Sequence, residues 1–370
     1  MQAKKIKVGV LFGGKSTEHE VSIASARNVV KALNKDKYEV VLLGIDKKGN
    51  WHLNNDYQML FENQSEEKMK DEVQDNFGKE VFIVPNEEDN GKLVSLTNAV
   101  EAGEIDVFFP VLHGSFGEDG TIQGMFKLLN VPYVGADVLG AAVGMDKLVM
   151  KKLFIADRIP TCDYVGIHVH DRSEFPYEEV VERLKLPLFV KPANTGSSVG
   201  VSKVRNAVEF EAALDDAFQY DNRILVEECI VGREVECAVL GNENPKASIL
   251  GEIIPTHDFY SYDAKYMDEN GAKVAIPAHV DEATSDKIRA LAIKVFKTLC
   301  HEGMGRVDFF LTDEGEIFVN ELNSIPGFTN ISMYPQLWAA SGLPQPQLLD
   351  KLIELAMARF KRDQRLQIGL

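Results

Sequence analysis

Three oxygen-bearing side chains fall on a predicted β-hairpin near the carboxyl end of the chain. Asp308 lies on one predicted strand, and Glu321 and Asn323 lie two residues apart on the next. Because side chains alternate between the two faces of a strand, Glu321 and Asn323 share a face. A solvent-exposed hairpin is the simplest alternative, but apolar neighbours indicate a buried one, where unpaired carboxylates would be costly. Oxygen donors of this kind suit Mg²⁺ bound together with phosphate oxygens.

A second chemical signal is the segment 189–201, which reads FVKPANTGSSVGV. A predicted strand delivers Lys191, and a loop of small residues leads into another strand. Backbone N–H groups of such a loop can close over phosphates while Lys191 neutralises their charge. The Walker pattern is absent, so a P-loop kinase or GTPase is excluded. Taken alone, the segment is equally compatible with a surface hairpin rich in Gly and Ser.

The loop that follows Asn323 offers donors for acyl transfer. The N–H of Gly327 and the side chain of Arg306 can be aimed at a developing oxyanion. The sequence contains no credible Ser-His-Asp or Cys-His arrangement.

The elements that must position these groups follow from the apolar pattern. Residues 6–12 and 38–45 read as strands that flank a helix over 22–33, which is a βαβ opening. A strand over 106–112 feeds the Gly-rich loop 113–120, which precedes a helix over 121–129. This order places the loop at the carboxyl edge of an open sheet, where α/β folds bind ligands. The acidic, polar stretch 54–90 is predicted to be surface decoration.

Two further sections follow, and we expect domains at 1–146, 147–231 and 232–370. The first is an N-terminal α/β domain, the second carries the phosphate loop, and the third carries the metal residues. A helix opens the second section near Asp146, and a helix over 344–362 ends the third. Strands are predicted at 188–191, 199–203 and 224–227 in the second section, and at 234–240, 307–311 and 316–322 in the third.

Composition excludes several classes of protein. The 370 residues carry a formal net charge of −17, which would repel nucleic acid and anionic membranes. No signal peptide is recognisable, and no apolar run approaches the roughly 20 residues of a membrane span. The four cysteines show no metal or disulfide spacing, which favours reduced thiols and a cytoplasmic protein.

Seven segments in collinear order resemble the D-alanine–D-alanine ligase family of the ATP-grasp superfamily. Any one of them is moderately specific, whereas seven spread over nearly the whole chain are highly specific. The segments are FGGKSTEHEVS at 12–22, HGSFGEDG at 113–120, MDK at 145–147, KPANTGSSVG at 191–200, DAKY at 263–266, RVD at 306–308 and NELNSIPGFT at 320–329.

The resemblance implies a fold and a set of nucleotide contacts. The fold would be α/β with α+β elements: a three-domain ATP-grasp fold with an N-terminal open parallel sheet. ATP would lie between two sheets, and two Mg²⁺ (or Mn²⁺) ions would be held by Asp308, Glu321 and Asn323. The residues implied to contact ATP are Lys147, Lys191, Ser197 and Ser198 at the phosphates, Glu227, Glu228, Cys229 and Ile230 at the adenine, and Glu234 at the ribose.

The resemblance also implies substrate contacts. Glu18 would bind the ammonium of the first D-alanine, and His113 would lie near its carboxylate. Arg306 and Gly327 would stabilise the transition state. The remaining implied contacts are Ser332 and Lys265 at the carboxylate of the second D-alanine, and Tyr266 in a hydrogen-bonded trio with Glu18 and Ser197. Residues 258–271 are the candidate lid, with an ordinary surface loop as the alternative.

The implied activity is ATP-dependent joining of two D-alanine molecules through a D-alanyl phosphate, for peptidoglycan synthesis. Homodimerisation is implied by the resemblance alone. Retention of Tyr266 favours an amino-acid acceptor over D-lactate. The alternatives are a D-alanyl-D-lactate ligase, another ATP-grasp carboxylate–amine ligase and, from a different class, a non-catalytic nucleotide-binding module. The intact metal triad disfavours the last.

Overall fold

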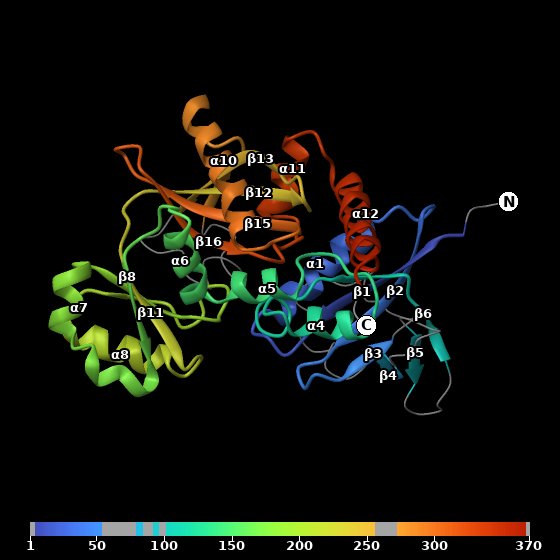
Figure 1. Ribbon diagram of the computed structural model, residues 1–370, viewed down its shortest axis with the longest axis horizontal. Helices are drawn as coiled ribbons and strands as arrows, with labels where there is room; N and C mark the ends of the chain where they lie inside the picture. The colour runs from blue at the N-terminus through green and yellow to red at the C-terminus, as the bar shows by residue number, and fades with distance from the viewer. Residues whose placement is uncertain (1–3, 54–78, 84–91, 96–100, 256–271, 368–370) are drawn as a thin grey trace.

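The structure is a computed structural model that describes residues 4–53, 79–83, 92–95, 101–255 and 272–367. Its strands form three sheets of seven, four and five strands. Figure 1 shows the seven-stranded sheet on the right, the four-stranded sheet on the left and the five-stranded sheet above the space between them.

The seven-stranded sheet has the order β6-β5-β4-β3-β2-β1-β7. Strand β1 (Ile6–Gly13) is parallel to both β2 (Tyr38–Ile45) and β7 (Val107–Pro110). The loops after β1 and β7 therefore meet at one edge of the sheet, as predicted. The other strands are antiparallel. They are β3 (Trp51–Leu53), β4 (Lys79–Ile83), β5 (Lys92–Ser95) and β6 (Glu101–Glu104).

Strand β4 corrects one prediction. It falls inside the segment 54–90 that we expected to be surface decoration, yet it pairs with β3 and extends the sheet. Its five residues have too little period to be recognised among polar neighbours. The helices of this region are α1 (His19–Ala32), α4 (Thr121–Leu128) and α5 (Val138–Met145).

The four-stranded sheet is antiparallel, in the order β10-β9-β11-β8. One face packs against helices α7 and α8, whose apolar side chains share a core with the strands. Its elements are β8 (Tyr164–His168), the 3₁₀-helix η1 (Val169–Glu174), α7 (Tyr177–Leu184), β9 (Leu188–Pro192), β10 (Ser202–Val204), α8 (Ala207–Ala217) and β11 (Arg223–Glu228).

The five-stranded sheet is also antiparallel, in the order β14-β13-β12-β15-β16. Its strands are β12 (Arg233–Gly241), β13 (Lys246–Pro255), β14 (Ala272–Ala275), β15 (Gly303–Leu311) and β16 (Ile317–Asn323). The helices around it are α6 (Lys147–Ala156), α10 (Glu282–Thr298), α11 (Met333–Ala340) and α12 (Gln345–Asp363).

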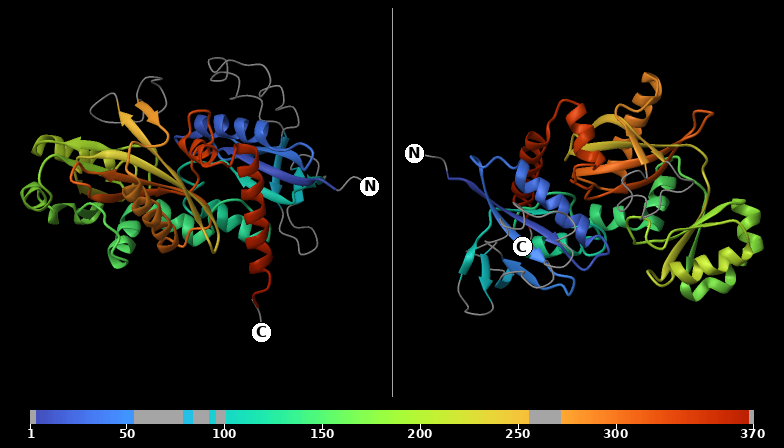
Figure 2. Two further views of the ribbon diagram at one scale, coloured as in Figure 1. Left: turned by 90° about the horizontal axis from the view of Figure 1, so that it is seen from above. Right: turned by 180° about the vertical axis from the view of Figure 1, so that it is seen from behind.

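Two cores connect parts of the chain that are far apart in sequence. One joins Val10 and Phe109 of the first sheet to Leu240 and Met304 of the third and to Leu349 of α12. The other packs α6 against the third sheet. Figure 2 shows α12 beside the N-terminal sheet, with its last turns extending beyond the rest of the chain. The first and third sheets are thus held together by shared apolar packing.

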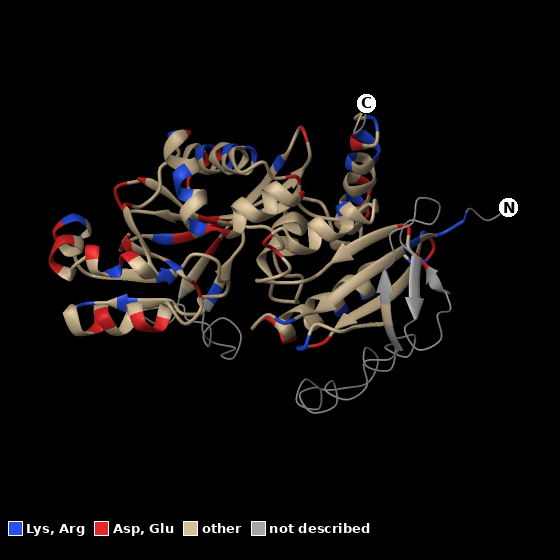
Figure 3. Cartoon of the chain, turned by 60° about the horizontal axis from the view of Figure 1, so that its bottom comes forward, with Lys and Arg blue, Asp and Glu red and all other residues tan. Residues whose placement is uncertain are grey.

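Positively and negatively charged side chains are mixed on the surface of the protein. Figure 3 shows Asp and Glu interspersed with Lys and Arg on the helices of the four-stranded sheet, and also meeting on the strands near the third sheet. Among the described residues, no helix combines the length and the apolar character that crossing a bilayer requires.

Candidate active site

The three predicted metal residues lie together on the paired strands β15 and β16. Asp308 stands opposite Glu321 in the ladder. The amide Nδ2 of Asn323 donates to Asp308 Oδ2 at 2.9 Å. Glu321 Oε2 lies 3.4 Å from Lys147 Nζ at the start of α6. The hairpin face therefore meets the first of the two predicted phosphate lysines directly.

Arg306 lies between two carboxylates on the same sheet. Its guanidinium donates to both oxygens of Asp308 at 2.7 Å. Its Nε also lies 3.0 Å from Glu236 Oε2 on β12. Burial alone would lower the pKa of Arg306, but Asp308 and Glu236 raise it, so the cation is permanent. Sequence reasoning missed Glu236, although its spacing from Glu234 predicts that both share a face of the strand.

Lys191 is held by a buried carboxylate. Its Nζ lies 2.7 Å from Glu227 Oε2, and Lys151 Nζ lies 3.1 Å from Glu227 Oε1. Lys151 is 1% exposed and also donates to Thr161. Burial would raise the pKa of Glu227, but the two ammonium groups lower it to about 2. The triad is therefore a charged network inside the protein, and Lys151 is a member that sequence reasoning did not find.

The Ser-rich loop between β9 and β10 reaches the N-terminal part of the chain. Ser197 and Ser198 both adopt positive φ, at 49° and 61°. Lys147 Nζ donates to the backbone oxygen of Thr195 at 2.8 Å, which fixes the base of the loop. The hydroxyl of Ser197 donates to Glu18, whose side chain is buried. Two members of the predicted trio are thus in contact.

Glu18 owes its place to helix α1. The helix begins at His19, three residues earlier than predicted, so Glu18 is its N-cap residue. The positive end of the helix dipole favours a carboxylate at this position. A side-chain atom on Gly196 would come within 2.7 Å of Glu18 Oε2, so the loop and the carboxylate are closely packed.

His113 and Glu118 contact the loop that follows β16. His113 Nδ1 lies 2.9 Å from the backbone oxygen of Ile325, and burial lowers the pKa of the imidazole. Glu118 Oε1 accepts from the backbone N–H of Ile325 at 2.6 Å. Burial, and then the nearby carboxylate of Glu18, raise the pKa of Glu118 to about 7. Sequence reasoning gave Glu118 no role.

Two of the predicted substrate residues, Gly327 and Ser332, lie in this same loop, whereas Arg306 lies on β15. Ser332 Oγ accepts from the backbone N–H of Thr329 at 2.9 Å. A side-chain atom on Gly327 would come within 2.7 Å of Ser332 Oγ, so the two residues are closely packed and a side chain at position 327 would displace that hydroxyl. Lys265 and Tyr266, as well as the candidate lid 258–271, lie outside the described residues.

The predicted adenine segment leaves β11 at the edge of the four-stranded sheet. Glu228 Oε1 accepts from the backbone N–H of Asp163 at 2.7 Å, which ties the segment to the start of β8. Cys229, Ile230 and Glu234 are half-buried. The segment therefore leads from β11 of the four-stranded sheet to β12 of the five-stranded sheet with partly exposed side chains.

The oxygen donors fit a hard divalent ion. Two carboxylates and one amide oxygen are the ligand types that Mg²⁺ takes. Among the described residues, no group of three or more His, Cys, Asp and Glu side chains is arranged to hold a metal by itself. Asp308 and Glu321 contribute only two such groups, so phosphate oxygens and water would complete the coordination.

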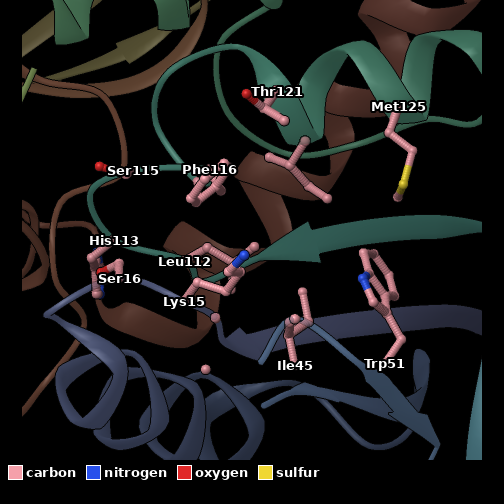
Figure 4. A pocket seen from close by; sticks show the side chains of 15 residues that line it. Lys15, Ser16, Ile45, Trp51, Leu112, His113, Ser115, Phe116, Thr121 and Met125 are labelled. Atoms are coloured by element: carbon pink, nitrogen blue, oxygen red, sulfur yellow. The ribbon is translucent and has the colours of Figure 1, made fainter. Parts of the chain in front are cut away.

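A separate pocket lies outside the carboxyl ends of β1 and β7. Figure 4 shows Trp51 and Ile45 on one side of it and Met125 on the other, with Lys15 and Phe116 to their left. The pocket shares the loop at His113 with the site above, but its lining contains no metal-site residue and neither phosphate lysine.

Comparison with known proteins identifies the family of the chain. The family model described as "D-ala D-ala ligase N-terminus" matches residues 7–136, and the one described as "D-ala D-ala ligase C-terminus" matches residues 153–354. A D-alanine–D-alanine ligase from Oceanobacillus iheyensis is 50% identical over 363 residues, which is 98% of each chain.

Solved structures give the same result. The D-alanine–D-alanine ligase from Coxiella burnetii superposes with a TM-score of 0.86 at 41% identity, covering 98% of this chain and 97% of that one. The VanG D-Ala:D-Ser ligase from Enterococcus faecalis superposes with a TM-score of 0.82 at 36% identity, covering 95% and 100%. The predicted ATP-grasp fold class is confirmed, and the chain belongs to the D-alanine–D-alanine ligase family.

Proposed function

We propose that this chain joins two molecules of D-alanine, with hydrolysis of ATP to ADP and phosphate, to make the dipeptide used in peptidoglycan synthesis. The observation that carries the proposal is the contact of Glu321 with Lys147. It joins a cluster of oxygen ligands on one sheet to a phosphate-binding lysine beside another, which is the arrangement that a metal–nucleotide complex requires.

The nucleotide would bind between the four-stranded and five-stranded sheets. Lys147 and Lys191 would contact its phosphates, and the loop of Ser197 and Ser198 would cover them. Positive φ at both serines supports this assignment, because such a backbone conformation can aim successive N–H groups at an anion. The remaining ATP contacts are assigned to Glu227, Glu228, Cys229, Ile230 and Glu234.

The divalent ions belong to the five-stranded sheet. Asp308, Glu321 and Asn323 would hold two Mg²⁺ (or Mn²⁺) ions. Ions bound there would neutralise the charge of the transferred phosphoryl group. Asn323 now donates to Asp308, so its amide must turn to present its oxygen.

The substrates would meet between the N-terminal loops and the third sheet. Glu18 would bind the ammonium of the first D-alanine, with His113 near its carboxylate. An oxygen of that carboxylate attacks the γ-phosphorus, ADP leaves, and an acyl phosphate forms. Ser332 would hold the carboxylate of the second D-alanine, whose neutral amine then attacks the carbonyl carbon; the nitrogen loses a proton and phosphate leaves. Arg306 and the N–H of Gly327 would stabilise the intermediate oxyanion.

Exclusion of water is a chemical requirement of this route. An acyl phosphate exposed to water hydrolyses, and its energy is lost without peptide-bond formation. The contact of Ser197 with Glu18 joins the phosphate loop to the N-terminal part of the chain over the substrates. Lys265 and Tyr266 would complete the enclosure from the candidate lid.

The larger-scale assignments are also proposals. We infer domains at 1–146, 147–231 and 232–370, a homodimer, and a cytoplasmic location, from the resemblance to the family. The packing of α6 against the third sheet means that the second domain, so divided, shares its first helix with the core of the third.

The identity of the acceptor is the main alternative. One relative is a D-Ala:D-Ser ligase, and it is less similar to this chain than the D-alanine–D-alanine ligases above. ADP formation should be measured with ATP and D-alanine, then with L-alanine, and with D-alanine plus D-lactate or D-serine. We expect D-alanine alone to suffice. Equal rates with L-alanine, or no response to D-alanine, would exclude the proposed activity.

Replacing Glu321 tests the metal site. We expect Glu321→Gln to lower ADP formation by at least about a hundredfold, because one metal ligand and its charge are lost. Its free energy of unfolding in urea should change by less than about 1 kcal/mol. Glu316→Gln, at an exposed position of the same hairpin, is the matched control and should keep full activity. Full activity of the Glu321 variant would refute the assignment.

A further inference from the structure

We propose that Ser25, Asn28 and Glu118 are positioning residues that hold the Gly327 loop from the N-terminal part of the chain. The inference rests on the function proposed above, in which the N–H of Gly327 stabilises an oxyanion. None of the three residues would touch substrate. They would act through the loop by fixing the peptides on either side of Gly327.

One side of the loop is held by helix α1. The backbone N–H of Phe328 donates to Ser25 Oγ at 3.1 Å, and Asn28 Nδ2 donates to the backbone oxygen of Phe328 at 3.0 Å. Ser25 and Asn28 are three residues apart, so they lie on one face of the helix. Both polar backbone groups of Phe328 are therefore bonded to α1, and its ring is fully buried.

The other side is held by the loop after β7. The backbone N–H of Ile325 donates to Glu118 at 2.6 Å, and its oxygen lies 2.9 Å from His113 Nδ1. Glu118 also accepts from the backbone N–H of Gly114 at 2.9 Å, which orients the carboxylate within its own loop. Both polar backbone groups of Ile325 are thus bonded as well.

A continuous chain of hydrogen bonds links the two sides. A carbonyl oxygen can only accept, so His113 must carry its hydrogen on Nδ1, and Nε2 must accept. Ser25 Oγ lies 3.2 Å from Nε2 and therefore donates its hydroxyl hydrogen to it. The same oxygen accepts from Phe328. The lowered pKa of buried His113 agrees with a neutral ring. Buried networks of this kind, fully satisfied, rigidify what they hold.

The two anchored peptides leave one donor between them. Pro326 has no N–H, and the N–H of Gly327 has no hydrogen-bond acceptor among the described residues. Its direction is set by Ile325 on one side and Phe328 on the other. Glu18 is the N-cap residue of helix α1, seven residues and about 10 Å before Ser25. One rigid helix therefore fixes the distance between the proposed ammonium site and the oxyanion donor.

The test separates the two chemical steps. Single-turnover rapid quench should follow ADP and dipeptide in Ser25→Ala, Asn28→Ala and Glu118→Gln. Misplacing the Gly327 N–H impairs the tetrahedral intermediate, so we expect dipeptide formation to slow about tenfold, corresponding to the loss of about one hydrogen bond. ADP formation should stay within about twofold. Parallel loss in both steps, or no loss in either, would overturn the proposal.

Ser22→Ala is the matched control. Ser22 is buried on the same helix, but it bonds to Gly13 and Val111 within the N-terminal sheet. We expect it to lower stability without changing the ratio of the two rates. A ratio that shifts as much as in Ser25→Ala would mean that any damage to α1 has this effect, and would refute a specific role for Ser25 and Asn28.

Backbone hydrogen exchange provides a readout independent of activity. In the full-length protein, the amide hydrogens of Phe328 and Ile325 should exchange faster in Ser25→Ala and Glu118→Gln, respectively, and remain protected in Ser22→Ala. Unchanged protection in both variants would overturn the inference even if the enzyme is active. A wild-type protein that forms no ADP with D-alanine would instead contradict the proposed function, while the exchange result would still decide whether these residues hold the loop.

Discussion

Each of three cations proposed to contact substrate also contacts a carboxylate of the chain. Lys147 lies beside Glu321, Lys191 beside Glu227, and Arg306 beside Asp308. When the substrates bind, phosphate oxygens would have to replace the carboxylates as partners of the cationic side chains. Metal ions would likewise have to replace the cationic side chains as partners of the carboxylates, because a buried charge left alone is costly. The side chains are therefore held near their working positions by one another.

Lys151 is the residue that we expect to matter most for the stability of these buried charge pairs. We expect Lys151→Met to lower the free energy of unfolding by about 3 kcal/mol, because it removes one of two cations from the buried carboxylate of Glu227. The measurement is urea unfolding. Lys152→Met, at the exposed neighbouring position, should change stability by less than about 0.5 kcal/mol. Equal effects of the two substitutions would show that the buried pair contributes nothing.

His301 gives a prediction with a definite sign. Burial lowers its pKa to about 3, below that of an unfolded chain, about 6.5. In acid, the unfolded state therefore binds more protons than the folded state. The contribution of the neutral buried ring to the free energy of unfolding is complete above about pH 6.5 and is lost as pH falls toward 3. Between pH 6 and pH 5, wild type should lose about 1 kcal/mol more than His301→Gln. Identical slopes in urea unfolding would contradict a buried neutral ring.

Much of the candidate site was predictable from residue type and strand alternation. The pairing of Asp308 with Asn323 and the approach of Lys147 follow from these rules and the family motifs. Glu236 and Lys151 were not found, because the partners that make them informative come from other strands and helices. A single sequence does not show such long-range pairs.

At the scale of elements, several strands and helices were predicted closely, whereas strands β8, β13 and β14 were not predicted at all. The bounds of β2 were predicted correctly, and β1 and β11 differ by one residue at most at each end. The start of α1 was placed three residues late, because the polar sequence before Ser22 gives no apolar period. The sharing of cores between distant sections depends on tertiary packing, which local patterns do not encode.

The N-terminus of helix α6 positions Lys147, one of the residues proposed to bind the nucleotide. Asp146 caps it by accepting from the backbone N–H of Val149 at 3.0 Å, and Asp146 also pairs with Arg223. Lys147 is the first helical residue. We expect Asp146→Ala to cost at least about 1 kcal/mol of stability and to raise the KM for ATP severalfold, because the start of the helix moves.

A capping residue on another helix serves as the control that separates loss of stability from the change in KM for ATP. Asp281 caps α10 in the same manner, accepting from the backbone N–H of Thr284 at 3.0 Å, and α10 carries none of the proposed site residues. Asp281→Ala should lower thermal stability and leave the KM for ATP unchanged. If both variants raised the KM equally, general loss of stability would explain the effect, and the cap of α6 would have no special role.

At the scale of the whole molecule, the three sheets are joined by two different kinds of contact. The first and third share an extensive apolar core. The four-stranded sheet reaches the first sheet through the polar contact of Ser197 with Glu18. Opening and closing can break a small polar contact at a low cost in free energy. We therefore expect the four-stranded sheet to move relative to the first and third sheets, which stay packed together.

Ser197→Ala tests what that contact achieves. Without the hydroxyl, the loop loses its tie to Glu18, and water gains access to the acyl phosphate before the amine attacks. We expect ADP formation to continue while dipeptide formation falls, so that the ratio of ADP to dipeptide rises from about one to well above it. Both products should be quantified in the same reaction. Ser202→Ala, on the neighbouring strand β10, serves as the control and should keep a ratio near one. If Ser197→Ala slowed both products equally, the contact would align substrates without excluding water, and the closure of the three sheets would have to depend on other residues.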